Sequence, residues 1–277
     1  MAQAFDVCIR GAGIVGRTLA LLLARDRLRV ALVERPRSGA EDVRAYAMNA
    51  ASRELLLSLR SWPDEQHATP VTRMEVAGDD GGRVHFSSAE QAVPALAWIV
   101  DVPPLEARLA EAVRFQPLVE VVGEPVKAPL TVVCEGRSSA TRAEFGVDFE
   151  SRPYPQRAIA ARLECEFPHG GTARQWFDGG NVMAFLPLGG PAGNSVALVW
   201  SVLDDAAAGL LAASPADFSA KAQEASGGAL GKLTLTSERV AWPLQLAWAR
   251  RWVGPGWALA GDAAHTVHPL AGQGLNL

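Results

Sequence analysis

The sequence predicts an α/β protein in which a domain built on a parallel sheet is interrupted by a second, mostly antiparallel domain. Within the first 33 residues, a strand, a glycine-rich turn, a helix and a second strand follow one another. This order is typical of a βαβ unit with parallel strands and a right-handed crossover. From Arg157 onward, β-type runs alternate with Gly and Pro clusters, as they do in antiparallel sheets.

The elements expected in the first half of the chain follow from periodicity and from turn residues. The run Ile14–Arg25 is apolar nearly all round and is therefore expected to form a helix buried on a sheet. The glycines and aspartates of 78–82 favour a hairpin. The elements expected in this half are strands Phe5–Arg10 and Val30–Val33, helices Ala51–Leu59 and Leu105–Val113, and hairpin strands Thr72–Ala77 and Arg83–Phe86.

The second half is expected to be mainly strands, with one helix that begins at Pro215, a favoured first helical residue. Asp204 and Asp205 are interpreted as a solvated turn. The expected elements are strands Ala158–Phe167, Thr172–Phe177, Asn181–Leu188, Ser195–Leu203 and Leu233–Trp242, and helix Pro215–Ala225. We expect residues 1–70, 96–150 and 253–277 to form the first domain, and residues 71–95 and 151–252 to form the second.

Composition excludes several classes of protein. Hydrophobic residues make up 49% of the 277 residues, which is ample for a buried core. A net charge of −4 and the lack of a long basic run argue against nucleic-acid binding. The apolar run from Thr18 to Ala24 is too short to span a bilayer. Three dispersed cysteines without a CxxC pair indicate a reducing compartment, with no structural disulfide and no thiolate metal site.

A GxGxxG motif occupies the turn between the first strand and the first helix. Gly11 permits the tight turn, Gly13 allows backbone to approach a diphosphate, and Gly16 allows close helix–sheet packing. Glu34 ends the second strand 18 residues after Gly16, where an acid accepts hydrogen bonds from an adenosine ribose. The motif predicts dinucleotide binding. Because no second strand–GxGxxG–helix unit is present, a reductase with two dinucleotide sites is not expected.

The end of the chain, GDAAHTVHPLAGQGLNL from Gly261 to Leu277, resembles the second FAD motif of the group A flavoprotein monooxygenases, which have the p-hydroxybenzoate hydroxylase-like fold. The sequence of this motif is most similar to that of the ubiquinone-biosynthesis hydroxylases of the UbiH/UbiF/VisC type. Four more stretches carry the same resemblance: Arg44–Leu56, Glu166–Phe177, Ala184–Leu188 and Ser195–Ser201. The resemblance implies a Rossmann-like FAD-binding domain interrupted by a mostly antiparallel β-sheet substrate domain.

The resemblance also implies roles for individual residues. Asp262 resembles the acid that binds the ribityl hydroxyls of FAD, and Arg44 the arginine that reaches its pyrophosphate. Residues Gly272–Asn276 resemble the loop whose backbone faces the flavin ring. The expected FAD-binding residues are Gly11, Gly13, Ile14, Val15, Gly16, Glu34, Arg35, Arg44, Arg108, Gly136, Gly261, Asp262, Pro269, Gly272, Gln273, Gly274, Leu275 and Asn276. No catalytic side chain is assigned, and His265 and His268 are interpreted as structural.

Three departures from the family pattern affect these assignments. Glu135 stands where the middle motif of the family has Asp, before Gly136. Glu106 stands where an Arg or Gln is common, and Arg108, one turn later, is the candidate substitute. Only 16 residues, 115–130, separate the preceding helix from the middle motif, and their prolines disfavour regular strands. The first two departures concern cofactor contacts, and the third predicts a shortened β-meander.

The resemblance implies an NAD(P)H-dependent FAD monooxygenase that hydroxylates an aromatic ring with O2 through a C4a-hydroperoxyflavin. The implied substrate is a polyprenylated phenol of ubiquinone biosynthesis. Its lipid solubility implies a cytoplasmic enzyme with peripheral contact to the inner membrane or to a ubiquinone-biosynthesis complex. Two alternatives stay open: a hydroxylase of a small soluble phenol, and a non-catalytic flavin- or lipid-binding accessory subunit. Family members continue past the position of Leu277, so we expect this sequence to be C-terminally truncated.

Overall fold

The half of the molecule that contains the first βαβ unit is built on a six-stranded sheet of order β16-β17-β9-β1-β2-β8. The structure is a computed structural model, which describes residues 4–35, 42–268, 272 and 274–276. Strand β1 is parallel to both of its neighbours, β2 and β9, and the sheet continues in parallel to β8 and β17. The strands are β1 Val7–Arg10, β2 Val30–Val33, β8 Val119–Val122, β9 Leu130–Val133, β16 Val253–Gly254 and β17 Trp257–Leu259.

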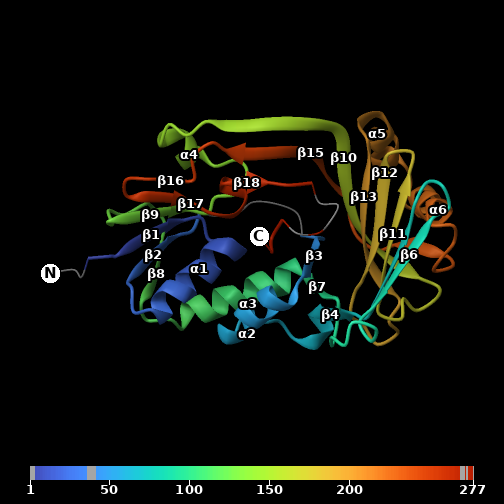
Figure 1. Cartoon of the computed structure of the whole chain (residues 1–277), viewed down its shortest axis with the longest axis horizontal. Coiled ribbons are helices and arrows are strands. Elements are labelled where there is room, and N and C mark those ends of the chain that lie inside the picture. The colour runs from blue at the N-terminus through green and yellow to red at the C-terminus, as the bar shows by residue number, and fades with distance from the viewer. Residues whose placement is uncertain (1–3, 36–41, 269–271, 273, 277) are drawn as a thin grey trace.

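Helix α1 (Ile14–Arg25) connects β1 to β2 and buries Ala20, Leu21 and Ala24. These side chains share a core with Ile9 and Leu32 of the sheet, and with helix α3 (Val102–Arg114). Figure 1 shows α1 and α3 together on one face of the parallel sheet. The remaining helices are α2 Ala50–Ser58, α4 Ala140–Glu144, α5 Asp204–Ala212 and α6 Pro215–Ala225, with short 3₁₀ turns η1 Glu65–His67 and η2 Gly261–Ala263.

A nine-stranded sheet and a three-stranded sheet make up the rest of the protein. The three-stranded sheet has the order β3-β7-β4 and is antiparallel. In the nine-stranded sheet, the parallel pair β5–β11 is the exception among antiparallel pairs. The strands are β3 Ala45–Met48, β4 Ala68–Val71, β5 Arg73–Ala77, β6 Arg83–Ser87, β7 Ala97–Asp101, β10 Phe149–Cys165, β11 Thr172–Asp178, β12 Asn181–Pro187, β13 Ser195–Leu203, β14 Leu233–Leu235, β15 Val240–Ala249 and β18 His265–Thr266.

The two faces of the nine-stranded sheet pack against different partners. Because successive side chains of a strand point to opposite faces, Leu198 of β13 packs toward α5 and α6, whereas Ala197 packs toward the three-stranded sheet. Strands β10 and β15 of the nine-stranded sheet pair along most of their length. They extend across the top of the view in Figure 1 toward the parallel sheet. These two strands physically connect the halves of the molecule.

The predicted α/β class and the first βαβ unit are confirmed, and α1, β2 and α6 have the predicted bounds. One interpretation was wrong: Asp204 and Asp205 form the first turn of α5, where acidic side chains favour the positive end of the helix dipole. The strand expected over Leu233–Trp242 is divided into β14 and β15. The short strands β3, β4, β7, β8 and β9 were not predicted, although residues 123–129 form no strand, as their prolines suggested.

Candidate cofactor site

Four chain segments leave the parallel sheet at the same edge. In the sheet register, Leu259 of β17 is level with Val133 of β9, which is level with Arg10 of β1, which is level with Val33 of β2. Each of these residues is the last of its strand. Since carboxyl ends of parallel strands form the ligand-binding edge of an open α/β sheet, the following segments meet there: 11–16, 34–35, 134–139 and 260–265.

The glycine turn after β1 leaves no room for a side chain at Gly11 or Gly16. Gly11 has a φ of +112°, and a Cβ atom there would lie 2.4 Å from the carbonyl oxygen of Cys134. A Cβ on Gly16 would lie 1.8 Å from the carbonyl oxygen of Gly11. Gly13 is the N-cap of α1 and supplies no side-chain hydrogen bond. The first N–H groups of α1 are thus left for a ligand, and a helix N-terminus favours a diphosphate.

Glu34 stands directly after β2, where an adenosine ribose is expected. Its backbone N–H donates to the carbonyl of Val122, which fixes the position of the residue at the sheet edge. The guanidinium of Arg17, in the first turn of α1, donates from Nη2 to Glu34 Oε1 at 2.5 Å. Glu34 is largely exposed, whereas only 11% of the Arg17 side chain is exposed. The carboxylate is therefore held from one side and open on the other.

The middle motif has a structural role that its sequence did not reveal. The Glu135 carboxylate accepts hydrogen bonds from Ser139 Oγ at 2.7 Å, Thr141 Oγ1 at 2.8 Å and Thr141 N at 3.2 Å. Burial acts to raise the pKa of Glu135, but these hydrogen bonds and the charge of Arg10 together hold it below its usual value. Glu135 therefore organises the start of α4 as a carboxylate.

Arg142 of α4 connects the middle motif to the motif after β17. Its buried guanidinium donates from Nη1 to the carbonyl of Ala263 at 3.1 Å and from Nη2 to the carbonyl of Arg137 at 2.8 Å. It also lies 3.5 Å from the ring centroid of Phe149. The turn that carries Asp262 is thereby fixed to the segment that contains Gly136.

Asp262 lies in that turn, η2, close to the glycine turn. A Cβ on Gly261 would lie 3.0 Å from Val15 Cγ2, so the two predicted motifs are in contact. Packing around Asp262 raises the pKa of its carboxyl group by desolvation, although the charges of Arg137, His265 and Arg44 act in the opposite direction. Among the described residues, no side chain donates a hydrogen bond to Asp262. Its carboxylate is available to accept bonds from a polyol such as a ribityl chain.

The loop near the end of the chain is fixed to the three-stranded sheet by Asn276. Its amide nitrogen Nδ2 donates to the carbonyl of Ala47 at 2.7 Å and to that of Gly272 at 3.2 Å, while its Oδ1 accepts from the Asn49 N–H at 2.9 Å. Leu275 packs against the core of the parallel domain. The structure thus places Gly272 and Asn276 beside β3. Pro269 and Gln273 lie outside the described residues.

The two predicted arginines have protein partners in this structure. Arg44 is ion-paired with Asp42 at 2.6 Å, and this hydrogen bond raises its pKa. Arg108 points to Glu111 and Asp64. Glu106 acts on Arg44 electrostatically, so this departure from the family pattern lies near Arg44. A diphosphate contact would require Arg44 to leave Asp42, and a cofactor contact would require Arg108 to leave Glu111 and Asp64.

Sequence reasoning missed three residues at this edge. Arg17 follows the GxGxxG motif directly, and a cation there opposite an acid at the end of β2 is a readable signal. Arg137 stands inside the middle motif, and its charge partly offsets the rise that burial causes in the pKa of Asp262. Burial raises the pKa of the Tyr46 hydroxyl, which also experiences the charge of Asp262. No sequence pattern pointed to Tyr46, because its position depends on how β3 meets the parallel domain.

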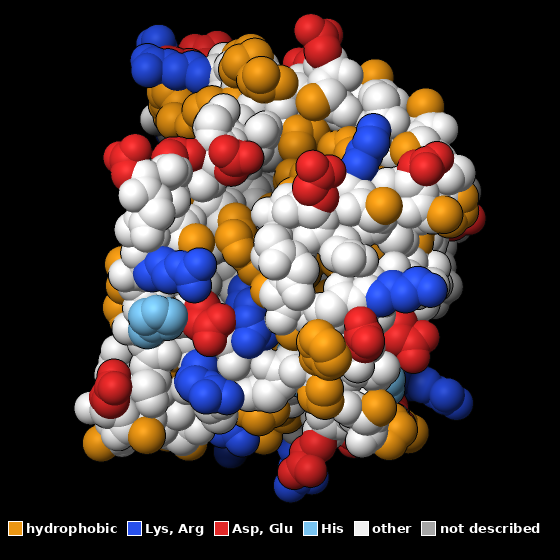
Figure 2. Space-filling view, turned by 90° about the vertical axis from the view of Figure 1, so that its right-hand side faces the viewer, with side chains coloured by type: hydrophobic (Ala, Val, Ile, Leu, Met, Phe, Trp, Pro, Cys, Tyr) orange, Lys and Arg blue, Asp and Glu red, His pale blue; other side chains and the backbone are white. Residues whose placement is uncertain are grey.

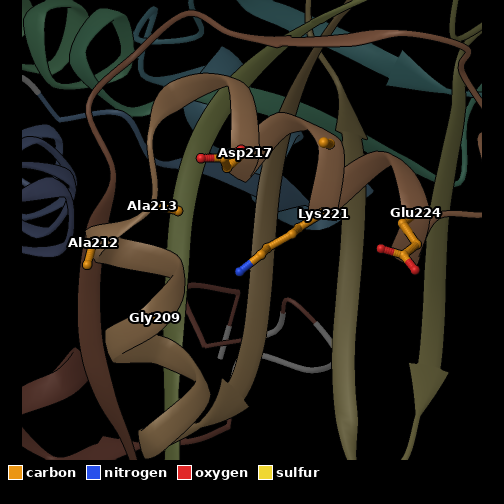
Figure 3. Close-up of a pocket in the computed structure, with 7 residues that line it drawn as sticks. Gly209, Ala212, Ala213, Asp217, Lys221 and Glu224 are labelled. Atoms are coloured by element: carbon orange, nitrogen blue, oxygen red, sulfur yellow. The ribbon is translucent and has the colours of Figure 1, made fainter.

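Two cavities lie outside this edge. One, of about 400 Å³, lies between α5 and α6, and Figure 3 shows Lys221 extending from α6 into the space between the two helices. It shares no residue with the predicted cofactor site. The other, of about 310 Å³, lies where the three-stranded and nine-stranded sheets meet. Its lining residues are Gln66, His67, Asp101, Arg162, Leu163, Leu188, Gly189, Gly190, Ser195 and Thr236.

The junction cavity contains a charged pair that joins the two sheets. Arg162 of β10 donates from Nη2 to Asp101 Oδ1 at 2.7 Å, and His67 Nδ1 lies 3.3 Å from Asp101 Oδ2. Leu163 and Leu188 provide apolar surface in the same cavity. Its volume is at the lower end of the range of small-molecule sites, and it can hold an aromatic ring.

This arrangement is typical of a dinucleotide-binding protein, and comparison with known proteins identifies its family. The family described as "FAD binding domain" matches residues 109–277. The chain is 31% identical to 3-demethoxyubiquinol 3-hydroxylase of Escherichia coli, over 99% of this chain and 77% of that protein. It is also 31% identical to ubiquinone hydroxylase UbiL of Rhodospirillum rubrum, over 98% and 69% respectively. The chain belongs to the FAD-dependent monooxygenases that include the ubiquinone-biosynthesis hydroxylases.

Solved structures confirm the fold. PqsL of Pseudomonas aeruginosa, in complex with 2-aminobenzoylacetate, matches with a TM-score of 0.82 at 24% identity, over 99% of this chain and 83% of that one. The p-nitrophenol 4-monooxygenase PnpA of Pseudomonas putida matches with a TM-score of 0.77 at 18% identity, over 99% and 76%. The predicted family, the FAD cofactor and the monooxygenase class are therefore confirmed.

Proposed function

We propose that this protein hydroxylates the aromatic ring of a polyprenylated phenol in ubiquinone biosynthesis, with NAD(P)H as reductant and O2 as oxygen donor. The similarity to 3-demethoxyubiquinol 3-hydroxylase and to ubiquinone hydroxylase UbiL supports the substrate class. NAD(P)H supplies the electrons that one atom of O2 needs to leave as water while the other enters the ring.

One observation carries the proposal: a single edge of the parallel sheet gathers a helix N-terminus and an acid on either side of it. Glu34 lies at the end of β2 and Asp262 follows β17, with the glycine turn between them in the sheet order. These groups match the adenosine ribose, the ribityl chain and the diphosphate of FAD respectively. The closeness of Gly261 to Val15 supports the assignment of the turn and the acid to one site.

The residues of the chain bind and orient the cofactor, and the cofactor, when bound, supplies the oxygen-activating redox chemistry. The N–H groups of α1 hold the diphosphate, Glu34 holds the adenosine ribose, and Asp262 accepts bonds from the ribityl hydroxyls. The loop fixed by Asn276 presents backbone to the ring system, against β3.

The junction cavity is the proposed place for the aromatic head group. It lies between β10 and the three-stranded sheet, and β3 of that sheet contacts the loop held by Asn276. Arg162, Ser195 and the glycine loop 189–190 provide polar groups for a phenol, and Leu163 and Leu188 provide apolar contact. A cavity of about 310 Å³ holds a ring but not a long prenyl chain. We therefore expect the prenyl tail to extend out of this cavity.

A peripheral association with the cytoplasmic face of a membrane follows from the proposed substrate. Among the described residues, no helix is long and apolar enough to cross a membrane. Figure 2 views the end of the protein that carries α5 and α6, where hydrophobic side chains occur in small groups between charged side chains of both signs. This end offers no large apolar surface, so another face, or a partner in a biosynthetic complex, provides the proposed contact.

The experiment compares a geranylated phenol with the same phenol lacking the geranyl group. The purified protein is loaded with FAD, and NADH or NADPH oxidation is measured together with the hydroxylated product by mass spectrometry. We expect product from the geranylated phenol with a kcat/KM at least about tenfold higher, because burial of a few CH₂ groups contributes about 0.8 kcal/mol each. Equal or better use of the unprenylated phenol supports a hydroxylase of small soluble phenols instead.

A further inference from the structure

Arg17 and Glu34 form an ion pair that joins the first turn of α1 to the end of β2. Arg17 Nη2 lies 2.5 Å from Glu34 Oε1. Arg17 is held at its base because its backbone N–H donates to the carbonyl of Gly13 at 2.9 Å. Only 11% of its side chain is exposed, whereas 44% of the Glu34 side chain is exposed. The buried partner thus fixes the geometry of the exposed one.

We propose that Arg17 is a positioning residue that orients Glu34 for recognition of the adenosine ribose. The inference rests on the proposed cofactor site. An exposed glutamate alone samples several rotamers, and ordering it on binding costs free energy. Arg17 occupies Oε1, and among the described residues no group bonds to Oε2, which can accept a ribose hydroxyl. The side chain is in this way organised before the cofactor arrives.

The carboxylate of the pair has a second consequence for selectivity. An ionised carboxylate accepts hydrogen bonds from the two ribose hydroxyls but repels a 2′-phosphate. Selectivity for free ribose hydroxyls therefore rests on Glu34, whose side chain Arg17 holds in place.

The test uses ADP and 2′,3′-dideoxy-ADP as probes, which share the diphosphate but differ in the ribose hydroxyls. Dissociation constants are measured by calorimetry for the wild type, for Arg17→Met, Arg17→Lys and Glu34→Gln, and for the double variant Arg17→Met with Glu34→Gln. Arg25→Met is the matched control, because Arg25 lies in the last turn of the same helix and bonds to Ser58. Thermal unfolding of each variant reports separately on any structural role of the pair.

Arg17→Met is expected to weaken ADP binding by at least about fivefold, a size consistent with a partly exposed ion pair acting on one hydrogen-bonding partner. Dideoxy-ADP binding should change less than about twofold, and Arg17→Lys should recover part of the loss. In the Glu34→Gln background, Arg17→Met should have little further effect. Arg25→Met should bind both probes like the wild type.

Two outcomes overturn the inference while leaving the cofactor site intact. Equal weakening of both probes means that Arg17 contacts the diphosphate directly, and unchanged ADP binding with a lowered unfolding temperature means that the pair is structural only. If the wild type binds neither ADP nor FAD, the proposed cofactor site itself fails, and the inference fails with it. The wild-type measurement therefore distinguishes failure of the Arg17 inference from failure of the proposed cofactor site.

Discussion

Replacing Glu135 with Gln tests whether the middle motif is held together by a charge. The substitution keeps the shape of the side chain but removes the negative charge and one acceptor oxygen. In the structure, Glu135 accepts three hydrogen bonds from Ser139 and Thr141, and Arg10 Nε lies 3.7 Å from Oε1. Only 17% of the Glu135 side chain is exposed. The charge is thus partly shielded from water and is recognised by several donors.

The expected loss of stability at pH 7 is about 2 kcal/mol. A hydrogen bond to a charged group contributes about 1.5–3 kcal/mol, and Gln retains some of the bonds, so the loss corresponds to about one charged bond. The pKa of Glu135 is held below its usual value of 4.5. Its contribution is therefore complete above pH 4.5 and disappears as the pH falls through the folded-state pKa. The difference between wild type and variant should shrink as the solution becomes acidic.

Urea unfolding at pH 7 and at pH 4 measures this difference. Glu144→Gln is the control, because Glu144 also pairs with Arg10 at 2.8 Å but has 52% of its side chain exposed; it should cost less than about 1 kcal/mol. A Glu135→Gln loss that is equal at both pH values would refute the role of the charge. A variant as stable as the wild type at pH 7 would refute the role of Glu135 altogether.

Three further predictions concern the cofactor edge. Asp262→Asn should weaken FAD binding, which a FAD fluorescence titration measures. The same variant should raise the unfolding temperature of the apoprotein at pH 7, because burial raises the pKa of Asp262 and ionisation of the buried carboxyl costs stability. Thermal scans should show this gain disappear below about pH 3.8, where the carboxyl group is protonated in both the folded and the unfolded state. Glu34→Ala should weaken FAD far more than FMN, since FMN lacks the adenosine ribose; equal losses in the two titrations would contradict the assignment. Gly16→Ala should weaken FAD at least about tenfold, because its methyl group would meet the Gly11 carbonyl oxygen at 1.8 Å; binding by Gly16→Ala at wild-type strength would contradict the required close approach.

Elements with clear ends or a wholly apolar run between polar residues could be predicted from the sequence. Helix α6 has the predicted bounds because Ser214 caps its N-terminus and Pro215 fixes its first residue. Strand β2 could be predicted because it is a wholly apolar run between polar residues. Strands β3 and β7 could not, since each has four or five residues and is stabilised by its partner and not by its own pattern. Tertiary pairing decides such segments.

The candidate site was predicted as separate motifs, and the structure shows how they meet. The GxGxxG turn, Glu34 and Asp262 could be named because each occupies a characteristic place after a strand. The Arg17–Glu34 pair has a readable signal, a cation directly after the glycine motif and an acid at the end of β2. The hydrogen bond from Arg142 to Ala263 depends on packing across the fold, which spacing does not encode. The expected diphosphate contact of Arg44 stays a prediction, because Arg44 is paired with Asp42 in this structure.

Oxygen labelling of the product tests the central claim most directly. The FAD-loaded protein is incubated with NAD(P)H, a geranylated phenol and ¹⁸O₂, and the product is analysed by mass spectrometry. The account predicts that one ¹⁸O atom enters the product, in the new hydroxyl group on the aromatic ring, for each NAD(P)H oxidised. NAD(P)H oxidation that produces only hydrogen peroxide, or a hydroxyl group that carries oxygen from water, would contradict it.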